Sequence, residues 1–126
     1  MEKQFKVFLD AISEVGFRDL ASGSKIGFER ESLRVDNSRI SQKNHPSSLG
    51  SSNCNKYITV DFSEAQLELI TPPKSENRES LEILDNIHHY VIKNIGNEFL
   101  WPLSMPPRIR SEDDIQIAKF GSSHEG

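Results

Sequence analysis

The sequence predicts an α+β fold in which helices cover an antiparallel sheet. Two segments with helical periodicity flank a group of short strand-like runs, and turn residues separate these runs from one another. The length agrees with this fold, because 126 residues with 35% hydrophobic and 27% charged content suit one ordinary globular domain or a piece of one.

The first predicted helix runs from residue 3 to about residue 20. Its apolar residues recur at spacings of three to five, which indicates an amphipathic helix with one buried stripe. The stripe consists of Phe5, Phe8, Ile12, Val15 and Leu20. A Ser-Gly-Ser breaker follows, so we divide the chain into a leading part, about 1–24, and a second part, about 25–126.

A hairpin is predicted next. Residues 26–35 form a strand-like run, and Asp36, Asn37 and Ser38 are turn residues that lead into a return strand at 39–40.

Two further strands are predicted after a long polar segment. Residues 41–56 are rich in Ser and Asn, which indicates a surface loop, and its length suggests contact with a ligand or another segment. Residues 57–62 and 65–71 then form two strand-like runs with a bend between them, and Pro72 ends the second.

A second helix is predicted from about residue 79 to residue 95, where Gly96 supplies a stop. Its apolar face predicts that it covers the sheet. The Pro-rich segment 99–107 should be irregular but buried against something. Ser111 and Asp114 resemble a capping box that starts a short helix through residue 120.

The composition excludes several classes of protein. Fifteen basic residues against nineteen acidic ones give a net charge of -4, and the basic residues are scattered, which argues against nucleic-acid binding. A single cysteine, Cys54, excludes an internal disulfide framework and suits a reducing cytosol. We find no signal peptide and no membrane-spanning segment, so we expect a cytoplasmic protein.

Carboxylates within strand-like runs are the strongest functional signal. Residues two apart in a strand point to the same face, so Glu29 and Glu31 should project side by side. Glu64, Gln66 and Glu68 should do the same if the later strand begins that early, and Asp61 ends the strand before it. Adjacent carboxylates repel each other unless a cation lies between them or one takes up a proton.

Two interpretations of these acids remain open. Mg²⁺ prefers oxygen ligands and is usually held by a few carboxylates together with substrate phosphates, so the acids suggest nucleotide chemistry. Alternatively, the acids lie on the solvent face of an antiparallel sheet, where polar and apolar residues are expected to alternate.

Four motifs in order carry a resemblance to a known family. "FERESLRV", "ITVDFSEAQLELITP", "WPLSMPP" and "AKFGSS" resemble the N-terminal part of the proteobacterial glutamate-cysteine ligases. The resemblance implies an ATP-dependent ligase that joins the γ-carboxylate of glutamate to cysteine through an acyl phosphate, the first step of glutathione biosynthesis. It also implies an antiparallel sheet like that of glutamine synthetase, and Mg²⁺ or Mn²⁺ as the metal.

The resemblance also assigns site residues. The metal-binding acids of the family fall on Glu29, Glu31, Asp61 and Glu68. A substrate or nucleotide neighbourhood is implied for Glu64, Gly121, Ser122 and Ser123, while Phe120 stands where the family often has Tyr.

The length departs from the family, whose members are several times longer. We therefore expect only part of the active site, no ligase activity from this chain alone, and self-association through unpaired strand edges and apolar surface. Two alternatives stay open: a non-catalytic module that binds a partner through the Pro-rich segment, and a ligase that uses a different amine.

Overall fold

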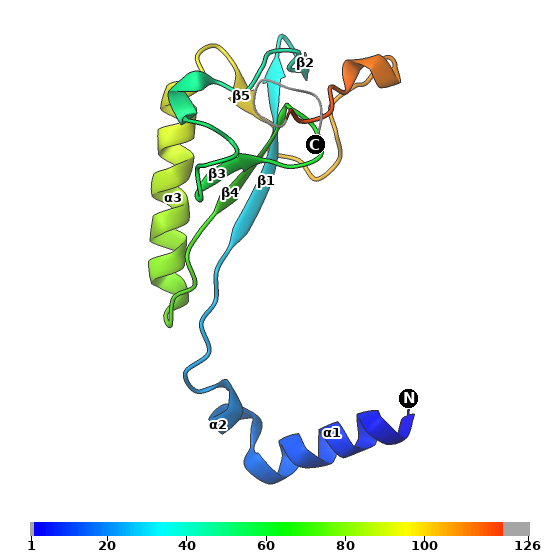
Figure 1. Ribbon diagram of the computed structural model, residues 1–126, viewed down its shortest axis with the longest axis vertical. Helices are drawn as coiled ribbons and strands as arrows, with labels where there is room; N and C mark the ends of the chain where they lie inside the picture. Colours follow the sequence, from blue (N-terminus) through cyan, green and yellow to red (C-terminus); the bar gives the residue numbers. More distant parts are fainter. Residues whose placement is uncertain (1, 120–126) are drawn as a thin grey trace.

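The computed structural model describes residues 2–119 as an α+β fold, in which a five-stranded antiparallel sheet lies beside one long helix (Figure 1). The predicted fold class is therefore confirmed. The strands are β1 (Glu29–Asp36), β2 (Arg39–Ile40), β3 (Ile58–Val60), β4 (Gln66–Ile70) and β5 (Phe99–Leu100). The helices are α1 (Glu2–Val15), α2 (Phe17–Ala21) and α3 (Asn77–Asn94), with short 3-10 turns at η1 (Ser47–Leu49) and η2 (Glu112–Asp114).

β1 organises the sheet, because it pairs with three other strands. Its first half pairs with β4, which pairs in turn with β3, and its second half pairs with β2 and β5. All of these pairings are antiparallel. This arrangement places β5 beside β1, although the two strands are far apart in the sequence.

α3 packs on one face of the sheet and forms the core with it. Leu67 and Leu69 of β4 are completely buried, as is Val91 of α3. Their alternation with polar neighbours explains the register, since a slip by one residue would turn these leucines away from α3. The remaining members of the core cluster are Leu49, Ile58, Ile95 and Leu100.

The predicted hairpin is confirmed, and its turn explains why these residues form it. Val35 pairs with Ile40 on either side of Asn37 and Ser38. Both turn residues have positive φ, 49° and 63°, as a two-residue turn of type I′ requires.

The polar segment 41–56 is less detached from the fold than a surface loop would be. Leu49, in η1, is only 2% exposed and belongs to the core cluster. Leu49 therefore anchors the segment to the core. The polar composition of the residues around it predicts a surface loop and does not indicate this anchor.

The predicted leading helix was wrong in two respects. The helix breaks at Gly16, whose φ of 83° is readily adopted only by glycine, so α1 and α2 are separate. The stripe is also exposed, with Phe5 62%, Phe8 59% and Val15 54% accessible, and α1 extends away from the sheet (Figure 1). The side chain of Leu20 lies outside the described part.

The predicted helix through residue 120 was also wrong. η2 covers three residues only, and Ile117 then forms a bridge with Ser63. The amide of Glu64 donates to the carbonyl of Gln116, and the amide of Ala118 donates to the carbonyl of Phe62. These partners in the bend between β3 and β4 replace the helical hydrogen bonds.

The Pro-rich segment was expected to be irregular and buried. β5 forms at its start, where Leu100 pairs with Arg34. Beyond it, Leu103 is 56% and Met105 68% exposed, so burial of the apolar segment was wrong for these residues. The indole of Trp101 donates to the carbonyl of Met105 at 2.7 Å, which turns the segment back on itself.

Candidate metal centre on the open sheet face

The sheet carries its acids on the face that points away from α3. Glu31 of β1 lies opposite Glu68 of β4, and Thr59 of β3 lies opposite Glu68 on the other side. Paired residues share a face, and Glu29 shares it too because it lies two residues before Glu31. The predicted side-by-side projection of Glu29 and Glu31 is confirmed.

The buried leucines of β4 determine this placement. Leu67 and Leu69 point toward α3, so Gln66 and Glu68 between them must point the other way. Asp61 joins the same face at the end of β3, where its backbone amide donates to the carbonyl of Gln66 at 3.1 Å.

The pKa of Glu68 is affected by the charges of the other three acids. Partial burial raises its pKa above the ordinary value, and the charges of Glu29, Asp61 and Glu31 raise it further. The other three acids therefore disfavour the ionised form of Glu68, and a cation between carboxylates relieves such repulsion.

Gln66 lies between two of the acids. Its side-chain nitrogen donates to Glu31 at 2.6 Å and to Asp61 at 3.1 Å. An ionised carboxylate can accept hydrogen bonds but cannot donate them, so the nitrogen end of the amide must face the two acids. The amide thus links an acid of β1 to the acid that follows β3.

The donor set fits a divalent cation in its chemistry. Carboxylate oxygens are the ligands that Mg²⁺ and Mn²⁺ favour, and four such groups share one face. Across residues 2–119, however, no three His, Cys, Asp or Glu side chains are grouped closely enough to hold a metal ion. The side chains must therefore converge for a cation to be bound.

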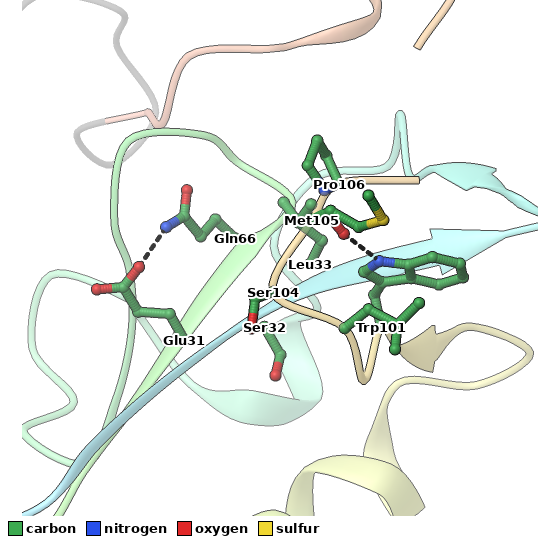
Figure 2. Close-up of a pocket in the computed structure, with 9 residues that line it drawn as sticks. Glu31, Ser32, Leu33, Gln66, Trp101, Ser104, Met105 and Pro106 are labelled. Carbon is green, nitrogen blue, oxygen red and sulfur yellow. Dashed lines mark hydrogen bonds between the residues drawn. The ribbon is translucent and has the colours of Figure 1, made fainter. Parts of the chain in front are cut away.

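A small cavity adjoins the acids. It measures about 310 Å³ and lies between the sheet face and the Pro-rich segment. Figure 2 shows Glu31 and Gln66 on one side of it and Trp101, Met105 and Pro106 on the other. Carboxylate and amide groups thus border an apolar wall, an arrangement suited to a ligand with one polar and one apolar part.

Glu64 has a different environment from the other acids. β4 begins two residues after it, and Glu64 is only 4% exposed. Its two carboxylate oxygens accept hydrogen bonds from the backbone amides of His45 and Lys119, with N–O distances of 2.8 and 2.9 Å. Glu64 therefore does not lie in a row with Gln66 and Glu68, and it holds the 41–56 segment and the C-terminal segment together.

A buried ion pair lies on the α3 side of the sheet. Arg34 is completely buried and donates to Glu98 at 2.8 Å, and it also donates to the carbonyls of Lys43 and Glu64. The two carbonyls accept from one guanidinium nitrogen, Nη2, and so offset part of the cost of burying the pair, while Arg34 Nε and Glu98 Oε1 have no hydrogen-bond partner among the described residues. The contact fixes the bend that carries Asp61.

Comparison with known proteins decides the family. The family model for glutamate-cysteine ligase matches residues 9–126, which is most of the chain. The chain belongs to the glutamate-cysteine ligase family. A glutamate-cysteine ligase of Pseudoalteromonas translucida is 44% identical over 119 residues, which cover 94% of this chain and 23% of the relative.

Solved structures place the fold of this glutamate-cysteine ligase family member among its relatives. A crystal structure of glutamate-cysteine ligase from Francisella tularensis in complex with AMP matches with a TM-score of 0.71 and 41% identity, over 76% of this chain and 20% of that one. A bifunctional glutathione synthetase from Pasteurella multocida matches with a TM-score of 0.72 and 37% identity, over 76% and 13%. The chain thus spans about a fifth of the length of the relatives it matches.

The described part of this ligase-family chain leaves some predicted residues untested. Gly121, Ser122 and Ser123, for which a binding role was implied, lie outside the described residues, as does Phe120. Among the helices of residues 2–119, none combines the length and the apolar character needed to cross a membrane.

Sequence reasoning placed Gln66 on the same face as Glu68 but gave no structural role to either Gln66 or Arg34 in this ligase-family chain. For Gln66 the sequence contained a signal of its face: it lies two residues before Glu68, and Leu67 and Leu69, which are buried, occupy the alternate positions. Its hydrogen bonds depend on Glu31 and Asp61 from two other strands, so strand pairing had to be known first. Arg34 carried no signal, because a charged residue in a strand is usually expected at the surface.

Proposed function

We propose that the protein is part of a glutamate-cysteine ligase, an enzyme that joins the γ-carboxylate of L-glutamate to the amine of L-cysteine and converts ATP to ADP and phosphate. The reaction passes through an acyl phosphate and begins glutathione biosynthesis. The observation that carries the proposal is the acid face itself, since Glu29, Glu31, Asp61 and Glu68 share it within the region that matches the family. The AMP complex of the Francisella tularensis relative supports a nucleotide as co-substrate.

In this proposal the four acids hold a divalent cation, Mg²⁺ or Mn²⁺. Such an ion neutralises the charge of ATP phosphates beside the substrate carboxylate and aligns the phosphoryl transfer. Glu29 and Glu31 approach from β1, Glu68 from β4 and Asp61 from the end of β3, so the sheet pairing sets their relative positions. The buried Arg34–Glu98 pair and Glu64 keep the Asp61 bend in place.

We assign the whole chain, 1–126, to the N-terminal portion of the catalytic domain, with the leading part at about 1–24 and the motif-bearing part at about 25–126. Gly121, Ser122 and Ser123 adjoin substrate in this proposal, and the protein works in the cytoplasm. Most contacts to ATP and cysteine belong to the four fifths of the relatives that this chain does not match. The isolated chain is therefore inactive.

A hybrid enzyme tests the activity. Residues 1–126 replace the matched region of the Pseudoalteromonas translucida relative, and ADP release is measured with glutamate and cysteine together and separately. We expect release that requires both amino acids and falls at least a hundredfold in Glu68→Gln, since a shared metal ligand is lost. Glu82→Gln, an exposed acid on α3, is the matched control and should keep full activity.

Each part of the proposal has its own contrary result. ADP release that needs both amino acids, obtained from the 126-residue chain alone, contradicts the inactivity of the isolated chain. A hybrid that is active but unaffected by Glu68→Gln contradicts the metal assignment.

A second candidate function is a non-catalytic module that binds a partner through the Pro-rich segment. It is favoured by the exposure of Leu103 and Met105 on that segment. Calorimetric titration with Mg²⁺ separates the two functions. If Glu68→Gln abolishes Mg²⁺ binding without loss of stability, the metal role holds, and if it changes neither, the acids are a solvated sheet face.

A further inference from the structure

Gln66 occupies the place between two acids that a shared cation needs. Its nitrogen lies 2.6 Å from Glu31 and 3.1 Å from Asp61, and these acids come from different strands. Figure 2 shows the nitrogen facing Glu31 while the amide oxygen points away from it. A cation bound jointly by these two carboxylates cannot coexist with an N–H donor at that position.

The residue type at this position has a chemical consequence. A lysine or arginine would neutralise the acids permanently and exclude a cation, and a fifth acid would add repulsion. An amide is neutral and has two different ends, a nitrogen that donates and an oxygen that accepts. Its last side-chain torsion is broad, so the two ends exchange at small cost.

The surroundings of Gln66 leave room for this exchange. It is half-buried rather than enclosed, and with Glu31 it borders the cavity of about 310 Å³ beside Trp101. Its backbone is held in β4, where it pairs with Leu33 of β1. The backbone is thus fixed, while the amide group is held by its two hydrogen bonds and has open space beside it in which to turn.

We propose that Gln66 is a two-state partner of the cation site, an inference that rests on the metal role proposed above. Without a cation, its nitrogen bridges Glu31 and Asp61 and limits their repulsion. When a divalent cation binds to these acids, the amide turns, and its oxygen becomes a neutral ligand beside the carboxylates. Gln66 thus prepares the site when it is empty and contributes to it when it is filled.

The test follows the amide directly, in the ¹⁵N-labelled 126-residue chain titrated with Mg²⁺. The side-chain amide signals of Gln66 are identified by their absence in Gln66→Leu. We expect them to shift as the nitrogen leaves the carboxylates, with the same Mg²⁺ dependence as calorimetric binding. The signals of Gln42, whose amide donates to the carbonyl of Asp114 away from the acids, should stay in place.

Variants separate the two roles of the residue. Gln66→Leu should weaken Mg²⁺ binding about tenfold, as loss of a supporting ligand does, and Gln42→Leu should leave it unchanged. Gln66→Glu keeps an oxygen for the cation but cannot donate while ionised. It should lower the melting temperature in EDTA, and saturating Mg²⁺ should reverse the loss.

The outcomes also distinguish this inference from the function on which it rests. If the chain binds Mg²⁺ but the Gln66 signals do not move, or Gln66→Leu binds as tightly or more tightly, the two-state role is overturned and the metal site stands. If the chain binds no Mg²⁺ at millimolar concentration and Glu68→Gln behaves like the original, both the two-state role and the metal site are overturned.

Discussion

Glu68 is the residue of the open face whose pKa responds to the charges of the other acids there. Partial burial and the charges of Glu29, Asp61 and Glu31 raise its pKa above the ordinary value of 4.5. Between 4.5 and the raised pKa, the folded chain binds more protons than the unfolded chain. The free energy of unfolding therefore falls as the pH rises through this window.

We expect Glu68→Gln to flatten this pH dependence in EDTA, because glutamine does not ionise. Urea denaturation at several pH values from 4 to 7 measures it, with Glu82→Gln as the control. At pH 7, Mg²⁺ should stabilise the original chain but not Glu68→Gln. Parallel stability curves for the original chain and Glu68→Gln would contradict the electrostatic coupling.

His88 gives a pH dependence of the opposite sign. Burial lowers its pKa below 6.5, and the nearby Arg30 and His89 lower it further, while Asp85 opposes them. The Nδ1 atom of His88 lies 3.5 Å from the guanidinium of Arg30, which favours a neutral ring that accepts the hydrogen bond. As the pH falls below 6.5, the unfolded chain takes up a proton first, so stability is lost.

Replacing His88 by glutamine should reduce the loss of stability between pH 7 and pH 5, since glutamine still accepts from Arg30. Thermal unfolding at both pH values measures the difference. His89 lowers the pKa of His88 less than burial and Arg30 do, so His89→Gln, at the adjacent and more exposed position on α3, should retain most of the original pH dependence. An unchanged difference in His88→Gln would show that the ring does not carry the effect.

At the residue scale, prediction from sequence succeeded where the alternation of side chains along a strand decides which face a residue occupies. It failed where hydrogen-bond partners distant in sequence decide the environment of a residue. Glu29 and Glu31 share a face because any strand places them so. Glu64 lies only four residues from Glu68, yet its carboxylate accepts backbone amides from His45 and Lys119. Those partners are distant in sequence, so no local pattern indicates them.

At the scale of elements, β4 connects the core with the site. Leu67 and Leu69 bury completely against α3 and thereby turn Gln66 and Glu68 to the open face. The alternation of buried and half-buried residues in β4 was readable in the sequence, as was the hairpin turn at Asn37. By contrast, residues 115–118 do not form a helix, because the bend between β3 and β4 supplies backbone partners for Gln116 and Ala118 and a bridge for Ile117.

We expect Leu67→Ala to lower the free energy of unfolding by about 2–5 kcal/mol, because it leaves a cavity in the centre of the core. Leu103→Ala, at a position 56% exposed, is the matched control and should cost no more than about 0.5 kcal/mol. Denaturation with urea measures both. Equal costs for the two variants would contradict the assignment of the core.

On the scale of the whole molecule, α1 carries apolar surface that the described chain does not bury. Phe5, Phe8 and Val15 are all more than half exposed on a helix that extends away from the sheet (Figure 1). β3 lies at the end of the strand order, so one of its edges is unpaired within the described sheet. Both features favour association with other polypeptide.

The purified 126-residue chain should therefore self-associate as its concentration rises. Sedimentation equilibrium measures this, and Phe5→Glu combined with Phe8→Glu should shift the chain toward the monomer because charge disfavours burial of the stripe. Leu103→Glu tests apolar surface elsewhere and should have less effect. A monomer at every concentration would contradict this prediction.

By itself, the sequence determined the α+β class, the hairpin, the span of α3 and the family, because each depends on local periodicity, turn chemistry or the order of motifs. Only the tertiary structure decided which distant groups meet. It placed Gln66 between Glu31 and Asp61, gave Glu64 two backbone partners, buried Arg34 against Glu98 and left the stripe of α1 exposed. The physical reason is that hydrogen bonds and burial depend on strand pairing, which joins residues that no local pattern relates.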